Sequence, residues 1–254
     1  MVEFYYRFGT TCRCLRELCI FGSRRFLGHG MANGAQHDVA KLLLEHLEPY
    51  GFALSGGLAL AEQGLTNRPT KDIDLFTLTF DDAMFDSAIT GALVALDEAG
   101  YVAELGRKSK SFARIDIDLG AEQLSVDLGY DYREHDTVQM DVGPVINKQD
   151  AILNKVSALY SRMLPRDFID VHNILESAVL SKSDILILSR ERDPGFVLEF
   201  FIDSLRRVQT LSLEDFGEYG TTPEALDTIK ATMSSWADEI EAGSIVGFLN
   251  EKKL

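Results

Sequence analysis

The sequence of 254 residues has few cysteines, no long apolar run and no excess of basic residues. Its three cysteines, Cys12, Cys14 and Cys19, lie within the first 20 residues, so a fold built on disulfides is not expected. No run of 18 apolar residues occurs, and we therefore expect no membrane span. The net charge is −15, which disfavours attraction of the whole surface to nucleic acid or to an anionic membrane but leaves room for a local basic groove.

Two classes of functional site lack support in the sequence. The C-x-C-x4-C spacing of the cysteines has no evident fourth ligand, so it does not indicate a zinc site. The five histidines show no metal-ligand spacing, and no convincing Ser-His-Asp order suggests a hydrolase.

The first 30 residues differ from the rest in charge. They hold five arginines and two glutamates, a charge of +3, so residues 31–254 carry −18. A basic start followed by an apolar stretch and a small-residue cleavage site is absent, so no secretory signal is indicated. We expect residues 1–30 to be a disordered extension, the folded chain to begin near Met31, and the protein to be cytoplasmic.

The remaining chain changes character near residue 147. Before this point, apolar spacing predicts helices and alternation predicts strands, with a hairpin formed by the last two strands; the helices are 38–47, 58–64 and 81–98, and the strands are 52–55, 72–78, 101–105, 111–119 and 124–131. After it, only helical patterns occur, at 149–163, 166–180, 193–208 and 223–242. The sequence predicts an α/β domain over 31–147, with a small mixed sheet flanked by helices, and an all-helical domain over 148–254.

The stretch LSGGLALAEQGLTNRPTKDIDLFT, residues 54–77, contains the strongest chemical signal. A glycine pair, Gly56 and Gly57, is followed after fourteen residues by Asp72 and Asp74, which point to the same side of a strand. Two neighbouring carboxylates repel each other unless a cation lies between them, and Mg²⁺ with a nucleoside triphosphate meets that need. The glycines would let the backbone approach a phosphate. Either motif alone is common, as a turn or as a solvated strand edge, so the combination is the informative feature.

A third carboxylate would strengthen a metal site. Asp127 is a single acid within an apolar strand that can run beside the first, and such an acid needs a partner. Asp116 and Asp118 form a competing D-x-D pair. We prefer Asp127 and leave the other two open.

A second motif joins the first in a family resemblance. NKVSALYSRMLPRDFIDVHNIL, residues 154–175, contains Lys155, Arg162, Arg166 and Asp170. Together the two stretches resemble the AbiEii/MenT-type nucleotidyltransferases, which are toxins of type IV toxin–antitoxin pairs within the polymerase-β-like superfamily. The resemblance covers roughly residues 38–180, and it departs from many superfamily members in having Gly57 where they have Ser.

The resemblance implies a nucleotidyltransferase fold and a role for each matching residue. Ser55, Gly56 and Gly57 match the phosphate-facing turn, and Asp72 and Asp74 match the metal pair. Lys155 matches a lysine that contacts the nucleotide phosphates, and Asp170 matches an acid that holds that lysine or a substrate group.

The residues alone support these roles less firmly. A lone helix lysine such as Lys155 is exposed by default, and on that basis we expect its removal to change stability little. Arg68 and Lys71 either offset triphosphate charge or form an exposed loop pair.

The sequence thus predicts a Mg²⁺-dependent enzyme that moves a nucleoside monophosphate from an NTP to an acceptor hydroxyl. The resemblance implies a tRNA 3′ end as acceptor, favours a pyrimidine nucleotide, and implies a cognate antitoxin. A small-molecule nucleotidyltransferase of the aminoglycoside-modifying kind and a non-catalytic module of the same fold are the alternatives. For RNA binding by so acidic a chain, a confined patch is needed, and the candidates are Arg190, Arg192, Arg206 and Arg207.

Overall fold

A computed structural model describes residues 31–79, 81–120 and 122–243 of the chain. The predicted extension over residues 1–30 and its three cysteines lie outside the described residues. Among the described residues, no helix has the length and apolar character needed to cross a membrane.

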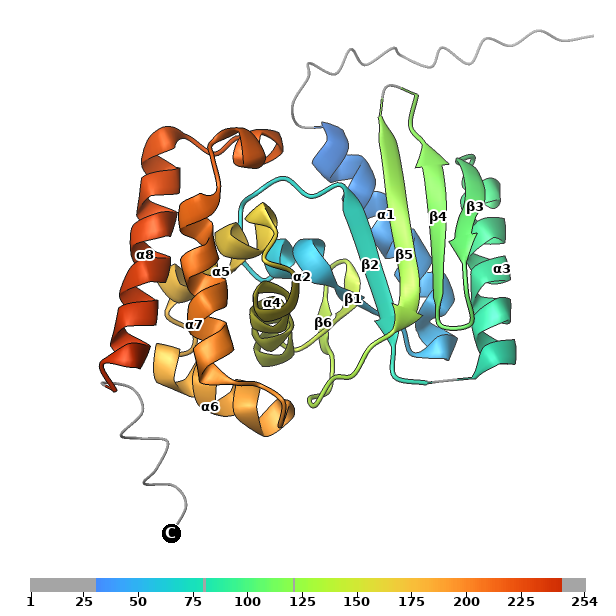
Figure 1. Cartoon of the computed structure of the whole chain (residues 1–254). Helices are drawn as coiled ribbons and strands as arrows, with labels where there is room; N and C mark the ends of the chain where they lie inside the picture. The colour runs from blue at the N-terminus through green and yellow to red at the C-terminus, as the bar shows by residue number, and fades with distance from the viewer. Residues whose placement is uncertain (1–30, 80, 121, 244–254) are drawn as a thin grey trace, which may run out of the picture.

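The first half of the chain forms a seven-stranded mixed sheet with helices on one face (Figure 1). The strand order is β3-β4-β5-β2-β1-β7-β6, with β2 parallel to β5, β1 parallel to β7, and the other neighbours antiparallel. The elements are α1 (Met31–Leu47), η1 (Glu48–Tyr50), β1 (Ala53–Ser55), α2 (Gly56–Glu62), β2 (Asp72–Thr77), α3 (Asp82–Glu98), β3 (Val102–Lys108), β4 (Phe112–Asp118), β5 (Gln123–Tyr130), β6 (Val138–Met140) and β7 (Gly143–Val145).

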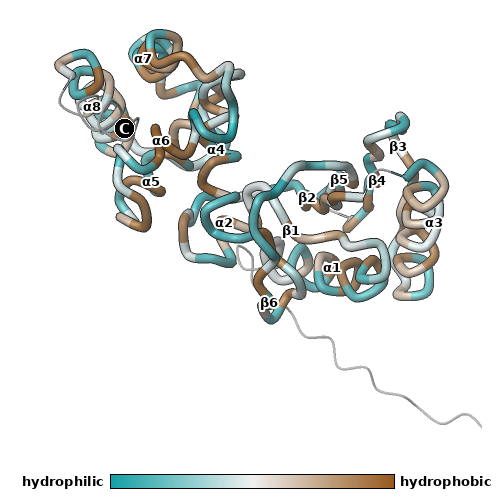
Figure 2. The backbone as a smooth tube through the Cα atoms, turned by 90° about the horizontal axis from the view of Figure 1, so that it is seen from below, coloured by the Kyte–Doolittle hydropathy of each residue, from teal (hydrophilic) through white to brown (hydrophobic). Residues whose placement is uncertain are grey.

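The alternation of each central strand decides which face of the sheet is covered. Ile73 and Leu75 of β2, Ile115 of β4 and Val126 of β5 are fully buried. α1 and α3 lie against this face (Figure 2), and α3 starts at Asp81, whose side chain accepts a hydrogen bond from Met84 N. The residues between the buried ones point to the opposite face, toward the helical half.

The second half is helical, as predicted, and the change falls where we expected it. Asn147 caps α4 by accepting from Gln149 N, directly after the last strand. The elements are α4 (Lys148–Arg162), α5 (Pro165–Ser177), α6 (Lys182–Arg192), α7 (Leu198–Arg206), η2 (Arg207–Thr210), η3 (Glu214–Tyr219) and α8 (Pro223–Glu241). Buried apolar residues of both halves belong to one continuous cluster. The division into two domains stays a prediction.

Three local expectations were incomplete. The hairpin of β6 and β7 was missed, since each strand has only three residues and β7 contains Pro144. α2 begins at Gly56 itself rather than after the glycine pair. α6 was not recognised as a separate helix, although Ser181 caps it through Asp184 N. The predicted hairpin of β4 and β5 is confirmed.

Candidate active site

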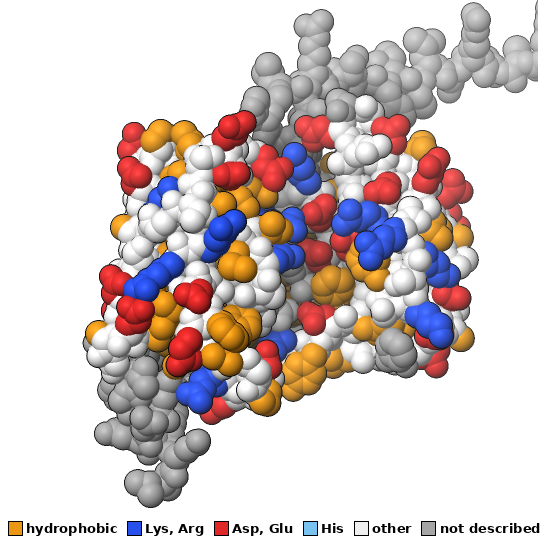
Figure 3. All heavy atoms as spheres, viewed as in Figure 1, with side chains coloured by type: hydrophobic (Ala, Val, Ile, Leu, Met, Phe, Trp, Pro, Cys, Tyr) orange, Lys and Arg blue, Asp and Glu red, His pale blue; other side chains and the backbone are white. Residues whose placement is uncertain are grey.

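A cleft of about 600 Å³ lies between the uncovered face of the sheet and helices α4 and α5. It is lined by parts of the chain that are far apart in sequence, from the turn after β1 to η3. Figure 3 shows acidic side chains in the hollow between the two halves, with basic side chains on both sides of it. A cleft of this size accommodates a nucleotide.

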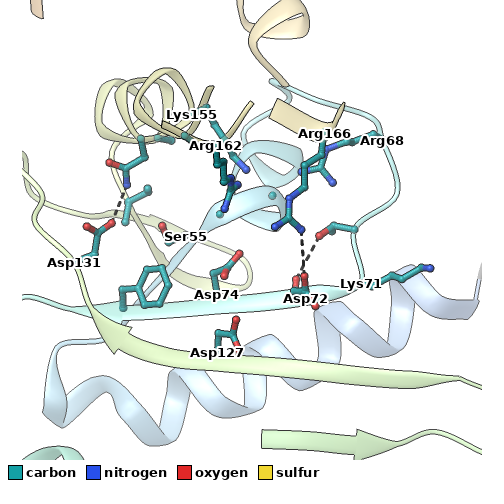
Figure 4. Close-up of a pocket in the computed structure, with 18 of the residues that line it drawn as sticks. Ser55, Arg68, Lys71, Asp72, Asp74, Asp127, Asp131, Lys155, Arg162 and Arg166 are labelled. Carbon is teal, nitrogen blue, oxygen red and sulfur yellow. Dashed lines mark hydrogen bonds and ion pairs between the residues drawn. The ribbon is translucent and has the colours of Figure 1, made fainter. Parts of the chain in front are cut away.

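The sheet wall of the cleft centres on Asp74. Because β2 lies between β1 and β5, Asp74 has Ser55 as its register partner on one side and Asp127 on the other. Asp72 lies two residues away on the same face, and Figure 4 shows the three carboxylates together on the sheet. The sequence prediction that β5 runs beside β2 is therefore confirmed.

Asp74 is the carboxylate with the least compensation. Among the described residues it accepts no hydrogen bond and forms no ion pair within 4.0 Å. Burial raises the pKa of Asp74 above its ordinary value, and the neighbouring charges of Asp127 and Asp72 raise it further, against the opposing influence of Lys155 and Arg166. Such a carboxylate needs a cation.

Asp127 has a partner already, which distinguishes it from Asp74. Nε and Nη2 of Arg114 on β4 both donate to it, at 2.7 Å each. Asp116 lies one strand farther from β2 and accepts from Ser125, and Asp118 ends β4 and accepts from Gly120 N. The placement of Asp127 beside Asp74 agrees with our preference, while its role as a metal ligand stays a prediction.

The donor set was tested for its fit to a divalent cation. Within the described residues, no group of three or more His, Cys, Asp or Glu side chains is arranged to hold a metal ion. The pair Asp72 and Asp74 nevertheless fits a hard cation, since both offer carboxylate oxygens on one face of a strand and no described residue pairs with Asp74. Two protein carboxylates plus phosphate oxygens are the usual ligands of Mg²⁺ at a nucleotide site.

Asp74 leaves no room for a side chain at Gly56, the first residue of α2. Gly56 has a φ of +63°, and a Cβ added there would overlap Oδ2 of Asp74. At Gly57 an added Cβ would lie 3.0 Å from both Nη2 of Arg68 and Oγ1 of Thr70. The backbone at Gly56 and Gly57 therefore lies directly against Asp74 and against the side chains of Arg68 and Thr70. Its contact with a phosphate stays a prediction.

The helical wall of the cleft is basic, and its cations are held by buried carboxylates. Asp170 is fully buried and binds Lys155 Nζ at 2.9 Å and Arg68 through Nε at 2.7 Å and Nη2 at 2.8 Å. Although burial alone would raise it, Arg68 and Lys155 keep the pKa of Asp170 below its ordinary value. Asp167, also fully buried, holds Arg162 by two hydrogen bonds of 2.9 and 2.8 Å.

The expectation of an exposed Lys155 was wrong, and one of the two alternatives left open for Arg68 is excluded. Lys155 is buried, with 7 % of its surface exposed, so it is not an exposed helix lysine. Arg68 does not belong to an exposed loop pair, because its side chain is 6 % exposed and bound to Asp170; Lys71 is exposed, as expected. Lys155 and Asp170, fifteen residues apart on separate helices, do converge.

Arg166 was quoted in the helical motif but given no role. Its Nη1 lies 3.7 Å from Oδ2 of Asp72, so it bridges the helical wall and the sheet wall. Its Nε is buried and has no hydrogen-bond partner in the part of the chain that the structure describes. Arg166 is therefore a cation on the helical wall whose hydrogen-bonding capacity is partly unused. In the sequence, the position of Arg166 directly before Asp167 in the helical motif was the feature that could have indicated a role.

Two of the four arginines suggested for RNA binding are engaged within the protein. Arg192 donates to Tyr132 O and lies 3.6 Å from the buried Asp150. Arg206 binds Glu241 and Asp238. Arg190 and Arg207 are exposed. Arg192 and Arg206 are therefore not free, and a role in RNA binding for Arg190 and Arg207 stays a prediction.

Comparison with known proteins identifies the family. The model of the family "Nucleotidyl transferase AbiEii toxin, Type IV TA system" matches residues 41–215. The structure is similar to JHP933 from Helicobacter pylori, with 15% identity, a TM-score of 0.55, and coverage of 89% of this chain and 99% of that one. A second H. pylori protein, described as a candidate nucleotidyltransferase, has 15% identity, a TM-score of 0.54, and coverage of 84% and 98%. No curated protein is a significant match.

The family match covers more than half of the chain, and the chain therefore belongs to the AbiEii nucleotidyltransferase toxin family. It is a nucleotidyltransferase, and the similarity to the two H. pylori structures agrees with the nucleotidyltransferase fold predicted from its sequence.

Proposed function

We propose that this nucleotidyltransferase uses Mg²⁺ to transfer a nucleoside monophosphate from an NTP to the 3′-terminal hydroxyl of a tRNA, as the toxin of a toxin–antitoxin pair. One observation carries the proposal. Asp74, which has no partner among the described residues, and its neighbour Asp72 face Lys155 and Arg166 across a cleft of about 600 Å³. A triphosphate chelated by a divalent cation has the charge distribution that fits between them.

The two walls have different tasks in this reaction. Asp72 and Asp74 would hold Mg²⁺, which when bound neutralises phosphate charge and lowers the barrier to attack at phosphorus. The acceptor hydroxyl oxygen forms a bond to the α-phosphorus and its proton passes to solvent, while the bond from the α-phosphorus to the oxygen that bridges it to the β-phosphate breaks and pyrophosphate leaves. Catalysis of such a transfer is mainly positioning and electrostatic stabilisation, so the fixed charges of the helical wall contribute beside the metal pair.

The helical wall is built to present positive charge toward the triphosphate. Asp170 fixes Lys155 and Arg68 from behind by direct bonds, which restricts their motion before substrate arrives. An ammonium has three donors, so Lys155 retains capacity for phosphate oxygens after bonding Asp170. Arg166 has a buried Nε with no partner and can turn from Asp72 to a phosphate when a cation takes its place.

The acceptor is the least constrained part of the proposal. A pyrimidine nucleotide and a tRNA acceptor come from the family resemblance, and a cognate antitoxin is implied by membership of a toxin family. A cationic drug as acceptor is the competing possibility, since the whole chain is acidic.

One assay tests these assignments together. The purified full-length protein is incubated with each α-labelled NTP, Mg²⁺ and total tRNA, and in parallel with an aminoglycoside. We expect label on the tRNA with one or two of the nucleotides and none without divalent cation. Label on the drug alone would show that the acceptor is a small molecule and not tRNA. Transfer that persists in EDTA would refute the metal assignment.

A further inference from the structure

The cleft carries basic charge on its sheet side that the triphosphate does not need. Four cations already line the helical wall, namely Arg68, Lys155, Arg162 and Arg166. Beyond Asp127, the sheet continues into β4 and the edge strand β3, and this side has its own basic residues.

The hairpin of β3 and β4 is basic in a strongly acidic protein. Residues 106–114, GRKSKSFAR, contain four basic residues and no acidic one, while the chain as a whole has a net charge of −15. We call Arg107, Lys110 and Arg114 the basic hairpin face. Lys108, the fourth basic residue, is treated separately because it lies elsewhere.

The strand alternation and a ring contact place two members of this face, Arg114 and Arg107, on the cleft side of the sheet. Ala113 and Ile115 are buried against the helices, so Phe112 and Arg114 point to the opposite side. Arg114 lines the cleft and is bound to Asp127. The guanidinium of Arg107 lies 5.4 Å from the centre of the Phe112 ring, which puts it on the same side.

The two remaining charges differ in their partners. Lys110 is in the turn between the strands, is exposed, and forms no ion pair among the described residues. Lys108 is exposed as well, but its Nζ lies 2.8 Å from Asp86 of α3, which covers the other face of the sheet. Lys108 therefore offers a basic residue in the same hairpin that points away from the cleft.

We propose that the basic hairpin face holds the phosphate backbone of an RNA acceptor and leads its terminal hydroxyl across Asp127 to the metal pair. The proposal rests on the proposed function and names the acceptor side of the same site. Positive charge next to a cleft suits a polyanion, whereas it repels a cationic drug. Arg107, held over an aromatic ring, also offers the planar guanidinium that binds phosphate through two hydrogen bonds.

The acidic floor of the cleft explains why this face is needed. Asp72, Asp74 and Asp127 repel an approaching phosphate backbone, so an RNA end must be anchored beyond them. Exposed phosphate contacts of this kind give affinity that falls with salt and has little sequence preference. We therefore expect strongly salt-dependent binding.

The test measures RNA binding without nucleotide. Binding of fluorescent tRNA to the full-length protein is followed by anisotropy over a series of KCl concentrations, for wild type, Arg107→Ala/Lys110→Ala and the matched control Lys108→Ala. Since each lost phosphate contact removes about 0.7–0.9 from the slope of log K against log salt, the double variant should bind about tenfold more weakly or worse, with a slope lower by about 1 to 2. Lys108→Ala should stay within about twofold of wild type.

Each outcome separates this inference from the proposed function. NTP binding, measured by calorimetry on the same samples, should be equal in all three proteins. If wild type binds NTP but the double variant keeps wild-type tRNA affinity and slope, or if Lys108→Ala weakens binding equally, the inference is wrong and the nucleotidyl transfer stands. Failure of wild type to bind any NTP would contradict the proposed function alone.

Discussion

The two walls of the cleft carry opposite charges and are compensated to different degrees. On the helical wall, Lys155 and Arg68 are bound to Asp170, and Arg162 is bound to Asp167, so most of the positive charge is balanced in the free protein. On the sheet wall, Asp74 has no partner among the described residues. The charges of the helical wall are thus mostly balanced within the protein, while the charge of Asp74 on the sheet wall is balanced only when a ligand brings positive charge.

This contrast predicts that charge removal acts on function at one wall and on stability at the other. The most severe effect on activity is expected at the sheet wall. Asp74→Asn should lower transfer by about a thousandfold or more, since a catalytic metal contributes several kcal/mol to the transition state. Stability should be unchanged or slightly higher, because a repelled carboxylate is removed. Single-turnover transfer and thermal unfolding measure the two effects, and wild-type turnover would refute the metal pair.

The helical wall should respond in the opposite sense to the matching substitution. Asp170→Asn leaves two buried cations without their carboxylate, and removing one partner of a buried ion pair costs about 3–5 kcal/mol. The free energy of unfolding from urea titration measures this loss. A change below about 1 kcal/mol would show that Asp170 does not hold the wall.

The pH dependence of stability sharpens the same comparison, because the two pKa shifts have opposite signs. The folded-state pKa of Asp170 is lowered, so its contribution is present above the ordinary value of 3.8 and is lost as pH falls through the folded pKa. The folded-state pKa of Asp74 is raised, so its ionisation costs stability as pH rises past 3.8. We therefore expect the free energies of unfolding of both variants, measured in EDTA, to approach that of wild type as the pH falls into strong acid. At neutral pH, Asp170→Asn should be less stable than wild type and Asp74→Asn more stable.

Lys155 binds the buried Asp170 and also faces the proposed triphosphate site. Its removal should therefore lower both activity and stability, each by less than the preceding substitutions do. Lys155→Ala should reduce kcat by about a hundredfold, the effect of losing one stabilising donor. It should also destabilise the fold by about 1–3 kcal/mol, since Asp170 keeps Arg68 but loses one of its buried partners. Saturating-NTP kinetics and urea unfolding measure the two effects. Unchanged kcat with reduced stability would reduce Lys155 to a structural role.

The smallest expected difference between two matched variants concerns Gly56, which lies against the sheet wall. Gly56→Ala places a Cβ on Asp74, whereas Gly64→Ala meets nothing within 4 Å. Both glycines have positive φ, so both variants share a backbone cost of about 1–2 kcal/mol. The overlap should make Gly56→Ala about 1–3 kcal/mol less stable than Gly64→Ala and impair transfer. Equal stability and activity in the two variants would show that Asp74 moves aside freely.

The fold could be predicted from the sequence where the apolar period was long and regular. The central strands and most of the helices follow from alternation or helical spacing, and the spacing of Asp72 and Asp74 placed them correctly on one face. The β6–β7 hairpin could not be found this way, because three-residue strands show no period.

The charged network of the helical wall was harder to predict, although part of its signal was present. Ala151, Lys155 and Leu159 share one helical face, and that face is buried, so the period itself indicated a buried lysine. The bond between Arg68 and Asp170 joins residues 102 positions apart, and no local pattern encodes it. The close approach of Gly56 to Asp74 likewise depends on the packing of two strands.

The most direct test of the account is the Mg²⁺ dependence of nucleotide binding. Thermal unfolding of wild type and Asp74→Asn is measured with NTP alone, Mg²⁺ alone and both together. If the sheet wall is completed by a metal–nucleotide complex, wild type gains about 2.7 kcal/mol at a hundredfold excess over Kd only when both are present, and Asp74→Asn loses that gain. Equal stabilisation of wild type by NTP with and without Mg²⁺, or an undiminished gain in Asp74→Asn, would contradict the account.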